Sequence, residues 1–417
     1  MPAPLDPLVL ERALHADPRE DRPPGRRRLK LPPRSFLLLA LALFLFSHVL
    51  SLLLGPRRSL AGTSRSIRVL FRDRPAILRI EADDLRATDG TRRFAFGRSL
   101  SLRTQGRGFL FLVGPKDLRI SERPEIRLRW KGPARFSWTE GNKETNRKAF
   151  GSMAVRSENG RLRIVFHVPL ELYLTGVLAS EMGTRFPLEA LKAQAVAARS
   201  YAISCRTRAG SKDFDLFDDA KSQVFEETST APEILEVVRR TRGEVLWFEG
   251  EVLRAYYHST CGGRTRDGRS FFRDVPSPPF RPVRCPWDRA SPLHAWKRLW
   301  TPSRMEAIGL PTSGGRPRIE VLERSERGDW IRLRIRFGSG PWRVLAGSSL
   351  RRNAKLPSLW IRSWRTAGKG GIVFEGRGFG HGVGLCQYGA AGWARKGADY
   401  RRILAHYYPG TTIAVLP

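Results

Sequence analysis

The chain has 417 residues, of which 41% are hydrophobic and 10% aromatic. This length and composition can bury a substantial core, which excludes an intrinsically disordered protein. Lysine and arginine outnumber aspartate and glutamate by 74 to 40, and the formal net charge is +34. The charge indicates a polyanionic neighbour, either nucleic acid, anionic lipid or an acidic cell-wall polymer, and does not choose among them.

The first part of the chain contains a predicted membrane segment. Residues 1–34 are rich in proline and arginine and predict a cytoplasmic, disordered leader. Residues 35–54, SFLLLALALFLFSHVLSLLL, are long enough to cross a hydrocarbon core of roughly 30 Å. We expect a signal anchor that is retained and crosses the membrane once. The alternative is cleavage of this segment near the sequence SLAG at about residue 60. The rest of the chain is then expected on the outer side, periplasmic or extracellular.

The next elements predict an α+β fold. Residues 55–164 contain short apolar segments such as AILRIEA and GFLFLVG between Gly, Pro, Asn and Asp turn signals, which predicts a β-rich N-terminal region. Helical periodicity begins at Pro169, and a second helix, from Pro187 to about Ile203, has small residues on one face. We expect these helices to form a hairpin packed on strands. Further helices are predicted at 231–242 and near the C-terminus.

Glu181 stands in the apolar series of the first helix, at helical spacing from Val177 and Leu178. A carboxyl group among apolar side chains has a raised pKa, so it can keep the proton that a general acid needs for glycosidic cleavage. The alternative is a surface residue at the helix end, or an ion pair with Arg185 or Arg199.

A second carboxylate for such chemistry has candidates in the stretch DFDLFDDAKSQVFEE, residues 213–227. Its spacing does not match a calcium-binding loop, so a solvated loop is the default interpretation for Asp213, Asp215, Asp218 and Asp219. A partner carboxylate is dispensable if the substrate supplies its own nucleophile. Muramic acid does so when its C6 hydroxyl closes onto C1, and one glutamate then acts first as acid and afterwards as base.

Two glycine-rich stretches carry histidines, YYHSTCGGRT at 256–265 and GRGFGHGVGLCQYGA at 376–390. Glycine allows the backbone to approach a ligand closely, so these loops are candidates to form a substrate groove. The polar side chains that could line it are His258, Ser259, Thr260, His381 and Gln387. The neighbours His258 and Ser259, or His381 and Cys386, also allow a nucleophilic hydrolase, although adjacency in sequence does not establish geometry.

The four cysteines are expected outside the cytoplasm, where disulfides persist. We predict a disulfide between Cys261 and Cys285, because both lie in Gly/Pro-rich loop sequence. The alternative is four unpaired, buried thiols. No CxxC or HxxxH spacing is present, so the sequence predicts no metal site and no cofactor.

Taken together, these motifs resemble the sporulation stage II protein D family, also called the SpoIID/LytB type. The segments that carry the resemblance follow the family's order: 168–203 with ALKAQAVAARSYAI, 215–227, 256–265, 376–397 and 403–413. The resemblance implies a catalytic domain over 165–417, with a possible insertion at 324–374 that matches nothing specific. It also implies an activity on peptidoglycan. Family members are lytic transglycosylases, which act on glycan strands stripped of their stem peptides, or amidase enhancers.

The resemblance also assigns residues. The family's catalytic glutamate falls on Glu181, with His258, Ser259 and His381 in the groove. Gln194, Arg199 and Tyr201 are implied to support the site from the second helix. Some members bind zinc through a D-x-C-D-D…H-C-Q segment, where this chain has Phe217, Lys221 and Ser222. Cys386 stands where a serine is common.

Three hypotheses follow. The first is a membrane-anchored lytic transglycosylase that gives 1,6-anhydromuramic ends on peptidoglycan glycan strands, in sporulation or cell-wall remodelling. The second is a non-catalytic glycan-binding enhancer that works with a cell-wall amidase. The third, nucleic-acid binding, rests on charge alone, and the sequence contains no recognisable RRM, KH or zinc-finger pattern, so we expect no nucleic-acid partner.

Overall fold

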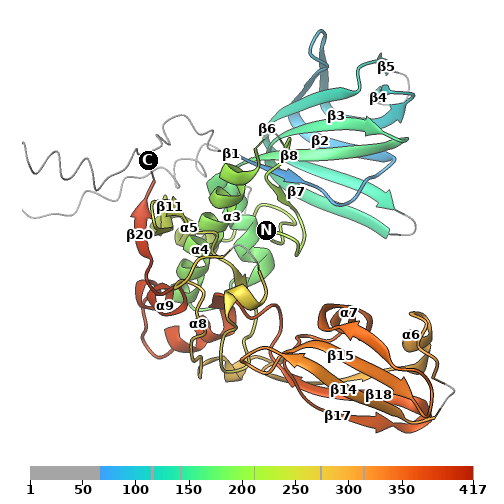
Figure 1. Ribbon diagram of the computed structural model, residues 1–417. Helices are drawn as coiled ribbons and strands as arrows, with labels where there is room; N and C mark the ends of the chain where they lie inside the picture. Colours follow the sequence, from blue (N-terminus) through green and yellow to red (C-terminus); the bar gives the residue numbers. More distant parts are fainter. Residues whose placement is uncertain are drawn as a thin grey trace, which may run out of the picture.

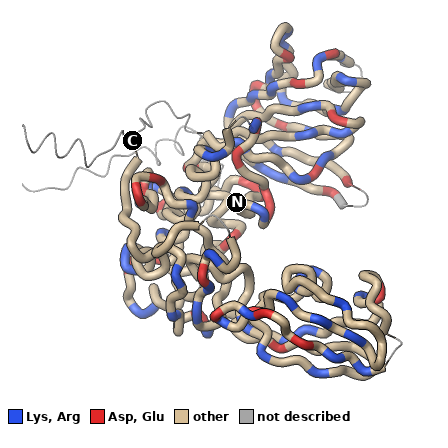
Figure 2. Tube along the Cα trace, viewed as in Figure 1, with Lys and Arg blue, Asp and Glu red and all other residues tan. Residues whose placement is uncertain are grey.

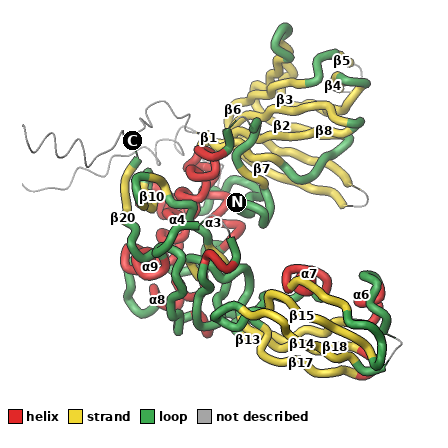
Figure 3. Tube along the Cα trace, in the orientation of Figure 1, coloured by secondary structure: helices red, strands yellow, loops and turns green. Residues whose placement is uncertain are grey.

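The computed structural model describes residues 66–113, 117–140, 143–210, 212–272, 275–312 and 315–416. The predicted leader and membrane segment, residues 1–34 and 35–54, lie outside this part. None of the helices that the structure describes is long and apolar enough to span a bilayer. The described residues have an α+β fold, in which a helical part lies in space between two strand-rich parts (Figure 1, Figure 3). The chain returns to the helical part after the second strand-rich part.

The first strand-rich part is a nine-stranded sheet with the strand order β5-β4-β3-β2-β6-β7-β8-β1-β9. Neighbouring strands are antiparallel except for the short parallel pair of β1 and β9. The strands are β1 (Ser66–Leu70), β2 (Ile77–Thr88), β3 (Arg93–Gln105), β4 (Gly108–Val113), β5 (Asp117–Ser121), β6 (Glu125–Glu140), β7 (Lys143–Glu158), β8 (Arg161–Pro169) and β9 (Leu216–Phe217).

The sheet is built from strands whose apolar side chains alternate with polar ones. In β2, Leu78 and Ile80 are buried while their neighbours in the strand are exposed, which is the pattern of a sheet with one face toward a core. Aromatic rings fill that core: Phe166 has its ring centroid 5.7 Å from Phe136 and 5.9 Å from Trp130. The core continues into the helical part without a break.

The helical part contains α3 (Leu170–Glu181), α4 (Leu188–Arg208), α5 (Pro232–Arg240), α8 (Gln387–Ala394) and α9 (Tyr400–Tyr407). Two small sheets accompany the helices. One joins β10 (Glu244–Phe248), β11 (Glu251–Val252) and β20 (Thr412–Val415), and the other pairs β12 (Tyr257–His258) with β19 (Leu385–Cys386). The predicted hairpin of two helices is therefore present as α3 and α4.

Helix α4 is buried on all sides, whereas its sequence indicates one packed face. Every residue from Ala190 to Cys205 is buried. The many alanines explain this, because a side chain of one methyl group lets neighbouring elements approach the helix closely from every direction. The helices α3, α5, α8 and α9 and the strand β10 all contact it. Helix α4 is therefore the central element of the part that contains the functional site.

The second strand-rich part has two three-stranded sheets and a hydrophobic core of its own. Its elements are β13 (Ala295–Trp300), α6 (Pro302–Glu306), β14 (Pro317–Arg324), β15 (Trp330–Phe337), β16 (Arg343–Ala346), α7 (Gly347–Asn353), β17 (Ile361–Ala367) and β18 (Gly371–Arg377). The residues of this core lie between Trp296 and Phe374, so the core begins before the predicted insertion at 324–374. The strand β13 belongs to it because β13 pairs along its whole length with β18. Lysine and arginine are spread over all three parts (Figure 2).

Candidate active site

Glu181 is the last residue of α3, and backbone hydrogen bonds from the two residues that follow it end the helix. Both Met182 and Gly183 donate their N–H groups to the carbonyl of Leu178, each at 3.0 Å. Gly183 has a φ of 73°, the left-handed conformation that commonly ends a helix and that glycine adopts without strain. The Glu181 side chain is half-buried and leaves the helix at this turn.

Three hydrogen-bond donors surround the Glu181 carboxylate. The backbone N–H of Val224 donates to Oε1 at 3.1 Å, and the hydroxyl of Tyr257 donates to the same oxygen at 3.5 Å. The side-chain amide of Gln387 donates to Oε2 at 3.4 Å. These donors come from three segments far apart in the chain, so the arrangement exists only in the folded protein.

The segment that contributes Val224 is held against α3 by close packing. The ring of Phe225 lies 5.1 Å from that of Tyr173, and both residues are fully buried. Gly176, on α3, has no side chain, and a Cβ there would overlap the carbonyl of Glu227 and the ring of Phe225. A larger residue at position 176 would therefore push the 224–227 backbone away from Glu181.

The environment of Glu181 raises its pKa. Burial disfavours the charged carboxylate and raises the pKa above the ordinary value of 4.5, while the three donors, from Val224, Gln387 and Tyr257, oppose this by favouring the charged form. Among the described residues, Glu181 has no ion pair within 4.0 Å, and Arg199 pairs with Glu171 instead. A carboxyl group that holds a proton and then a charge can serve as an acid and afterwards as a base.

Glu181 lies on a groove with a volume of about 530 Å³, within the range of small-ligand sites. It is the single acid among the residues that line the groove. The rings of Phe186 and Tyr388 meet edge to face at 5.3 Å on the wall. The lining consists of Glu181, Met182, Arg185, Phe186, Ser259, Gln387, Tyr388 and Arg395.

The structure brings Ser259 and Gln387 to this groove, as the sequence predicts. A short parallel pairing of β12 with β19 does so, with Tyr257 opposite Leu385 and His258 opposite Cys386. The pairing places the two glycine-rich stretches side by side. Gln387 is then the first residue of α8, one position after the strand ends.

The structure places the two predicted histidines beside the groove rather than on it. His258 is buried and donates from Nδ1 to the carbonyl of Val383 at 3.0 Å, and His381 Nδ1 accepts the N–H of Val383 at 3.1 Å. Burial lowers the pKa of both imidazoles, that of His381 to about 3. The Ser259 hydroxyl contacts Thr260, so neither histidine forms a nucleophile pair with Ser259 or Cys386 in the part that the structure describes.

The three supporting residues predicted on the second helix lie inside the protein. Arg199 is fully buried and binds Glu171 through two hydrogen bonds of 2.9 and 2.6 Å. Tyr201 packs on the ring of Tyr256, and Gln194 is fully buried, with both polar atoms of its side chain lacking a hydrogen-bond partner among the described residues. None of the three lines the groove.

The side chains of Asp215 and Asp218 are buried, so the default interpretation of a solvated loop is wrong for these two, whereas Asp213 and Asp219 are partly exposed. All four aspartates of the 213–219 loop pair with arginines of the N-terminal region and lie apart from the groove lining, which leaves Glu181 without a second carboxylate there. The pairs are Asp213–Arg163, Asp215–Arg68, Asp218–Arg147 and Asp219–Arg72.

Sequence reasoning missed several residues of the site. Tyr257 is the most informative, because it stands inside the glycine-rich stretch YYHSTCGGRT, directly before His258. Its hydroxyl accepts a hydrogen bond from Gln223 at 3.0 Å and donates one to Glu181. The groove residues Arg185, Phe186 and Arg395 lie in loops or at a helix end and show no periodic signal that could have selected them.

All four cysteines are buried, free thiols, and the predicted disulfide between Cys261 and Cys285 is not formed. The two sulfurs are nevertheless close to each other. They belong to a group that also includes Cys386 and Asp288, whose ligand atoms all lie within 4.8 Å of one another. Three thiols and a carboxylate that converge in this way could hold a metal ion, although their spacing in the sequence does not indicate such a site.

Comparison with known proteins identifies the family. The sequence model described as "Stage II sporulation protein" matches residues 158–248, which include α3 and α4. The stage II sporulation protein D of Bacillus amyloliquefaciens is 32% identical over 267 residues, covering 60% of this chain and 75% of that protein. The chain belongs to the stage II sporulation protein D family.

Two further relatives support this assignment. The stage II sporulation protein D of Bacillus subtilis is 29% identical over 270 residues, covering 60% of this chain and 76% of that protein. A protein of Bacillus subtilis described as an amidase enhancer is 26% identical over 291 residues, covering 58% of this chain and 40% of the relative.

The zinc site that the resemblance associates with some family members does not fit this chain. The matching positions hold Phe217, Lys221 and Ser222, which offer neither a thiolate nor an imidazole. The Ser222 hydroxyl accepts the backbone N–H of Phe217 at 3.1 Å and so closes the turn. Phenylalanine has no ligand atom, and neither lysine nor serine is among the usual zinc ligands.

Proposed function

We propose that this protein cleaves peptidoglycan glycan strands as a lytic transglycosylase, with Glu181 as the single catalytic residue. The observation that carries the proposal is a half-buried carboxyl group with a raised pKa, on a groove that contains no second acid. A binding protein gains nothing from such a site, whereas an acid catalyst needs it. Membership of the family and the similarity to an amidase enhancer support a role in the cell wall.

The contacts of Glu181 suggest how the proton moves. Oε1 accepts two hydrogen bonds, while Oε2 accepts one long one from Gln387. The proton is therefore held more readily on Oε2, and from there it transfers to the bridging glycosidic oxygen as the bond to the muramic C1 breaks. The donors to Oε1 then stabilise the carboxylate that remains.

The second step returns the proton to Glu181. The C6 hydroxyl of the same muramic residue attacks C1, and the carboxylate takes the hydroxyl proton as general base. The product has a 1,6-anhydro ring, no water is consumed, and Glu181 is protonated again. A mechanism of this kind uses one carboxyl group, as the lining of the groove offers.

The charge of the groove favours strands whose stem peptides have been removed. Removal of the peptide frees a lactyl carboxylate on each muramic residue. Arg185 and Arg395 line the groove near Glu181 and supply positive charge for that anion. In strands that keep their peptides the carboxylate is an amide, which carries no charge.

A second candidate function is a non-catalytic enhancer that binds glycan strands and stimulates a cell-wall amidase. The similarity to the Bacillus subtilis amidase enhancer favours it. Both functions place the described residues on the outer side of the membrane, and we propose that residues 35–54 anchor them there.

The test is to incubate the full-length protein with glycan strands pretreated by an amidase and to analyse the products by mass spectrometry. We expect 1,6-anhydromuramic ends, and a slower reaction on strands that keep their peptides. Glu181→Gln should lower the rate by about 100-fold or more, because it removes the general acid but keeps the side-chain shape.

The matched control is Glu226→Gln, the same change at an exposed glutamate two residues after Val224. It should react like the wild-type protein. If the wild-type protein leaves the strands intact but sediments with them and accelerates an added amidase, the enhancer function replaces the enzymatic one.

A further inference from the structure

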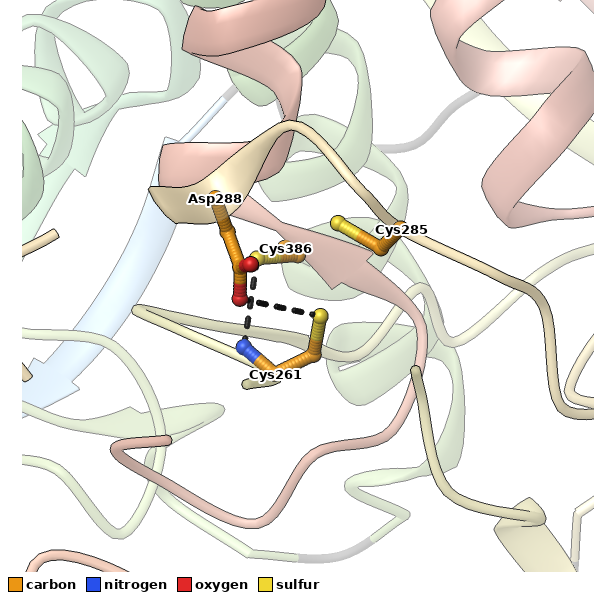
Figure 4. Close-up of side chains that lie close together, drawn as sticks. All are labelled: Cys261, Cys285, Asp288 and Cys386. Carbon is orange, nitrogen blue, oxygen red and sulfur yellow. Dashed lines mark hydrogen bonds between the residues drawn. The ribbon is translucent and has the colours of Figure 1, made fainter. Parts of the chain in front are cut away.

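A second cluster of reactive side chains lies behind the groove. Cys261, Cys285, Cys386 and Asp288 are all buried, and their ligand atoms lie within 4.8 Å of one another. Figure 4 shows the three thiols and the carboxylate directed toward a common point between the segments that carry them. The proposed reaction at Glu181 uses none of the four side chains.

The dimensions of the cluster suit a tetrahedral metal ion. Zinc binds sulfur at about 2.3 Å and carboxylate oxygen at about 2.1 Å, so tetrahedral ligand atoms lie about 3.6–3.8 Å apart. Cys261 Sγ lies 3.2 Å from Asp288 Oδ2, which a small outward movement would bring to that separation. A disulfide would use two of the sulfurs and leave the third thiol and a buried carboxylate without a role.

Several groups around the cluster are arranged as donors to the sulfurs, while the carbonyl of Ser259 lies 3.7 Å from Cys386 Sγ as an acceptor. Cys386 Sγ accepts the backbone N–H groups of Cys261 and of Gly389, each at 3.3 Å. The hydroxyl of Tyr407 lies 3.0 Å from Cys285 Sγ. Hydrogen bonds of this kind orient the ligands of a metal site and stabilise their negative charge.

Asp288 is oriented in the same way. His294 Nδ1 contacts Oδ1 at 2.9 Å, and the backbone N–H of Gly262 donates to Oδ2 at 2.6 Å. Oδ2 is the oxygen on the side of the Cys261 sulfur. The carboxylate is therefore held as a ligand that binds through one oxygen, with its other oxygen fixed by the histidine.

The backbone near α8 leaves space for the cluster. A Cβ on Gly389 would overlap Cys285 Sγ and the hydroxyl of Tyr407. The absence of a side chain at this position lets the first turn of α8 lie directly against the sulfurs.

We propose that Cys261, Cys285, Asp288 and Cys386 bind one zinc(II) ion in a closed, tetrahedral, structural site. Three thiolates and one carboxylate form a ligand set that zinc accepts, and four protein ligands leave no position open for a substrate. Binding releases the three thiol protons to solvent, and no oxidant or reductant takes part.

The ion would connect three segments beside the groove. Cys261 follows the groove residue Ser259 by two positions, and Cys386 directly precedes Gln387, which contacts Glu181. Cys285 and Asp288 come from the segment before the second strand-rich part. The metal would therefore fix the wall of the groove, independently of whether Glu181 acts as an acid.

The test is the metal content of the full-length protein, purified without chelator and measured by plasma mass spectrometry. We expect about one zinc per chain in the wild-type protein and in Glu181→Gln. Cys386→Ser and Asp288→Asn should lose most of it. Cys205→Ser is the matched control, because Cys205 is also a buried free thiol but lies outside the cluster.

A second measurement stays informative if a variant fails to fold. Cobalt(II) added to the wild-type protein from which zinc has been removed should give the absorption of a tetrahedral thiolate site. A chelator should then expose three further thiols to a thiol reagent. The proposal is overturned by a metal-free protein with four free thiols, by a protein with a disulfide, or by variants that keep their zinc.

Discussion

Glu181 combines three influences whose balance decides its chemistry. It is the last residue of α3, where unpaired carbonyl groups create partial negative charge that disfavours a carboxylate. Burial acts in the same direction and raises its pKa, while the hydrogen bonds from Val224, Gln387 and Tyr257 lower it. The raised pKa shows that burial outweighs these three hydrogen bonds. In the proposed mechanism, these donors stabilise the anion that forms after proton transfer.

The activity is expected to depend on pH through this group. The general acid must be protonated, so kcat/KM should fall as the pH rises through the pKa of Glu181, at a midpoint above the ordinary 4.5. Tyr257→Phe removes a donor that favours the charged form, which raises the pKa further. The fall in kcat/KM should therefore move to higher pH, measured on stripped strands.

The control for this experiment is Tyr388→Phe. Tyr388 lines the same groove, and its hydroxyl makes no hydrogen bond to Glu181 in the described part of the chain. Its profile should keep the wild-type midpoint. An equal displacement in both variants would mean that the fall reports a group other than Glu181.

At the scale of the elements, Arg199 illustrates how a polar residue of a family motif can be structural. Its guanidinium lies fully inside the protein and joins α4 to α3 through Glu171. It also donates to the carbonyl of Glu244 in β10 at 3.1 Å. Arg199 therefore holds α3, α4 and β10 together, and its buried position keeps it away from the groove.

Replacing this arginine should lower stability rather than substrate affinity. Arg199→Met leaves Glu171 without its partner, and the free energy of unfolding should fall by about 3–5 kcal/mol, measured by urea denaturation. The double variant with Glu171→Met should recover part of the loss, because no uncompensated charge remains. A higher KM with unchanged stability would show that Arg199 contacts the substrate after all.

At the scale of the whole molecule, the residues of the groove all lie in the helical part and its loops, between Glu181 and Arg395. The two strand-rich parts flank this region, and lysine and arginine are distributed over all three parts (Figure 2). A net charge of +34 favours a polyanionic partner, and under the proposed function that partner is an acidic wall polymer. The proposed reaction is confined to the groove.

The proposed anchor can be separated from the proposed reaction. Removing residues 1–54 should move the protein from the membrane fraction to the soluble fraction, because the apolar run is lost. The products from isolated strands should stay the same, since every groove residue is retained. Protease added to intact protoplasts should degrade the full-length protein, and resistance to it would contradict the outer location.

The sequence by itself determined the helices and the family and predicted Glu181 as the candidate acid, because periodicity and short motifs are local properties of the chain. Both helices of the hairpin and the β-rich first region follow from it. The tertiary structure alone decided which motif residues reach the groove. Ser259 and Gln387 do so while His258 and Arg199 do not, since orientation depends on the pairing of β12 with β19 and on packing around α4.

The cysteines show the same limit most clearly. Loop sequence suggested a pair, Cys261 with Cys285, but the folded chain adds Cys386, more than a hundred positions away, and Asp288. Only Cys285 and Asp288 are neighbours in the sequence, three positions apart, and no spacing connects them with Cys261 or Cys386. A cluster assembled from distant segments depends on how the backbone closes in space, and that closure is a property of the tertiary structure.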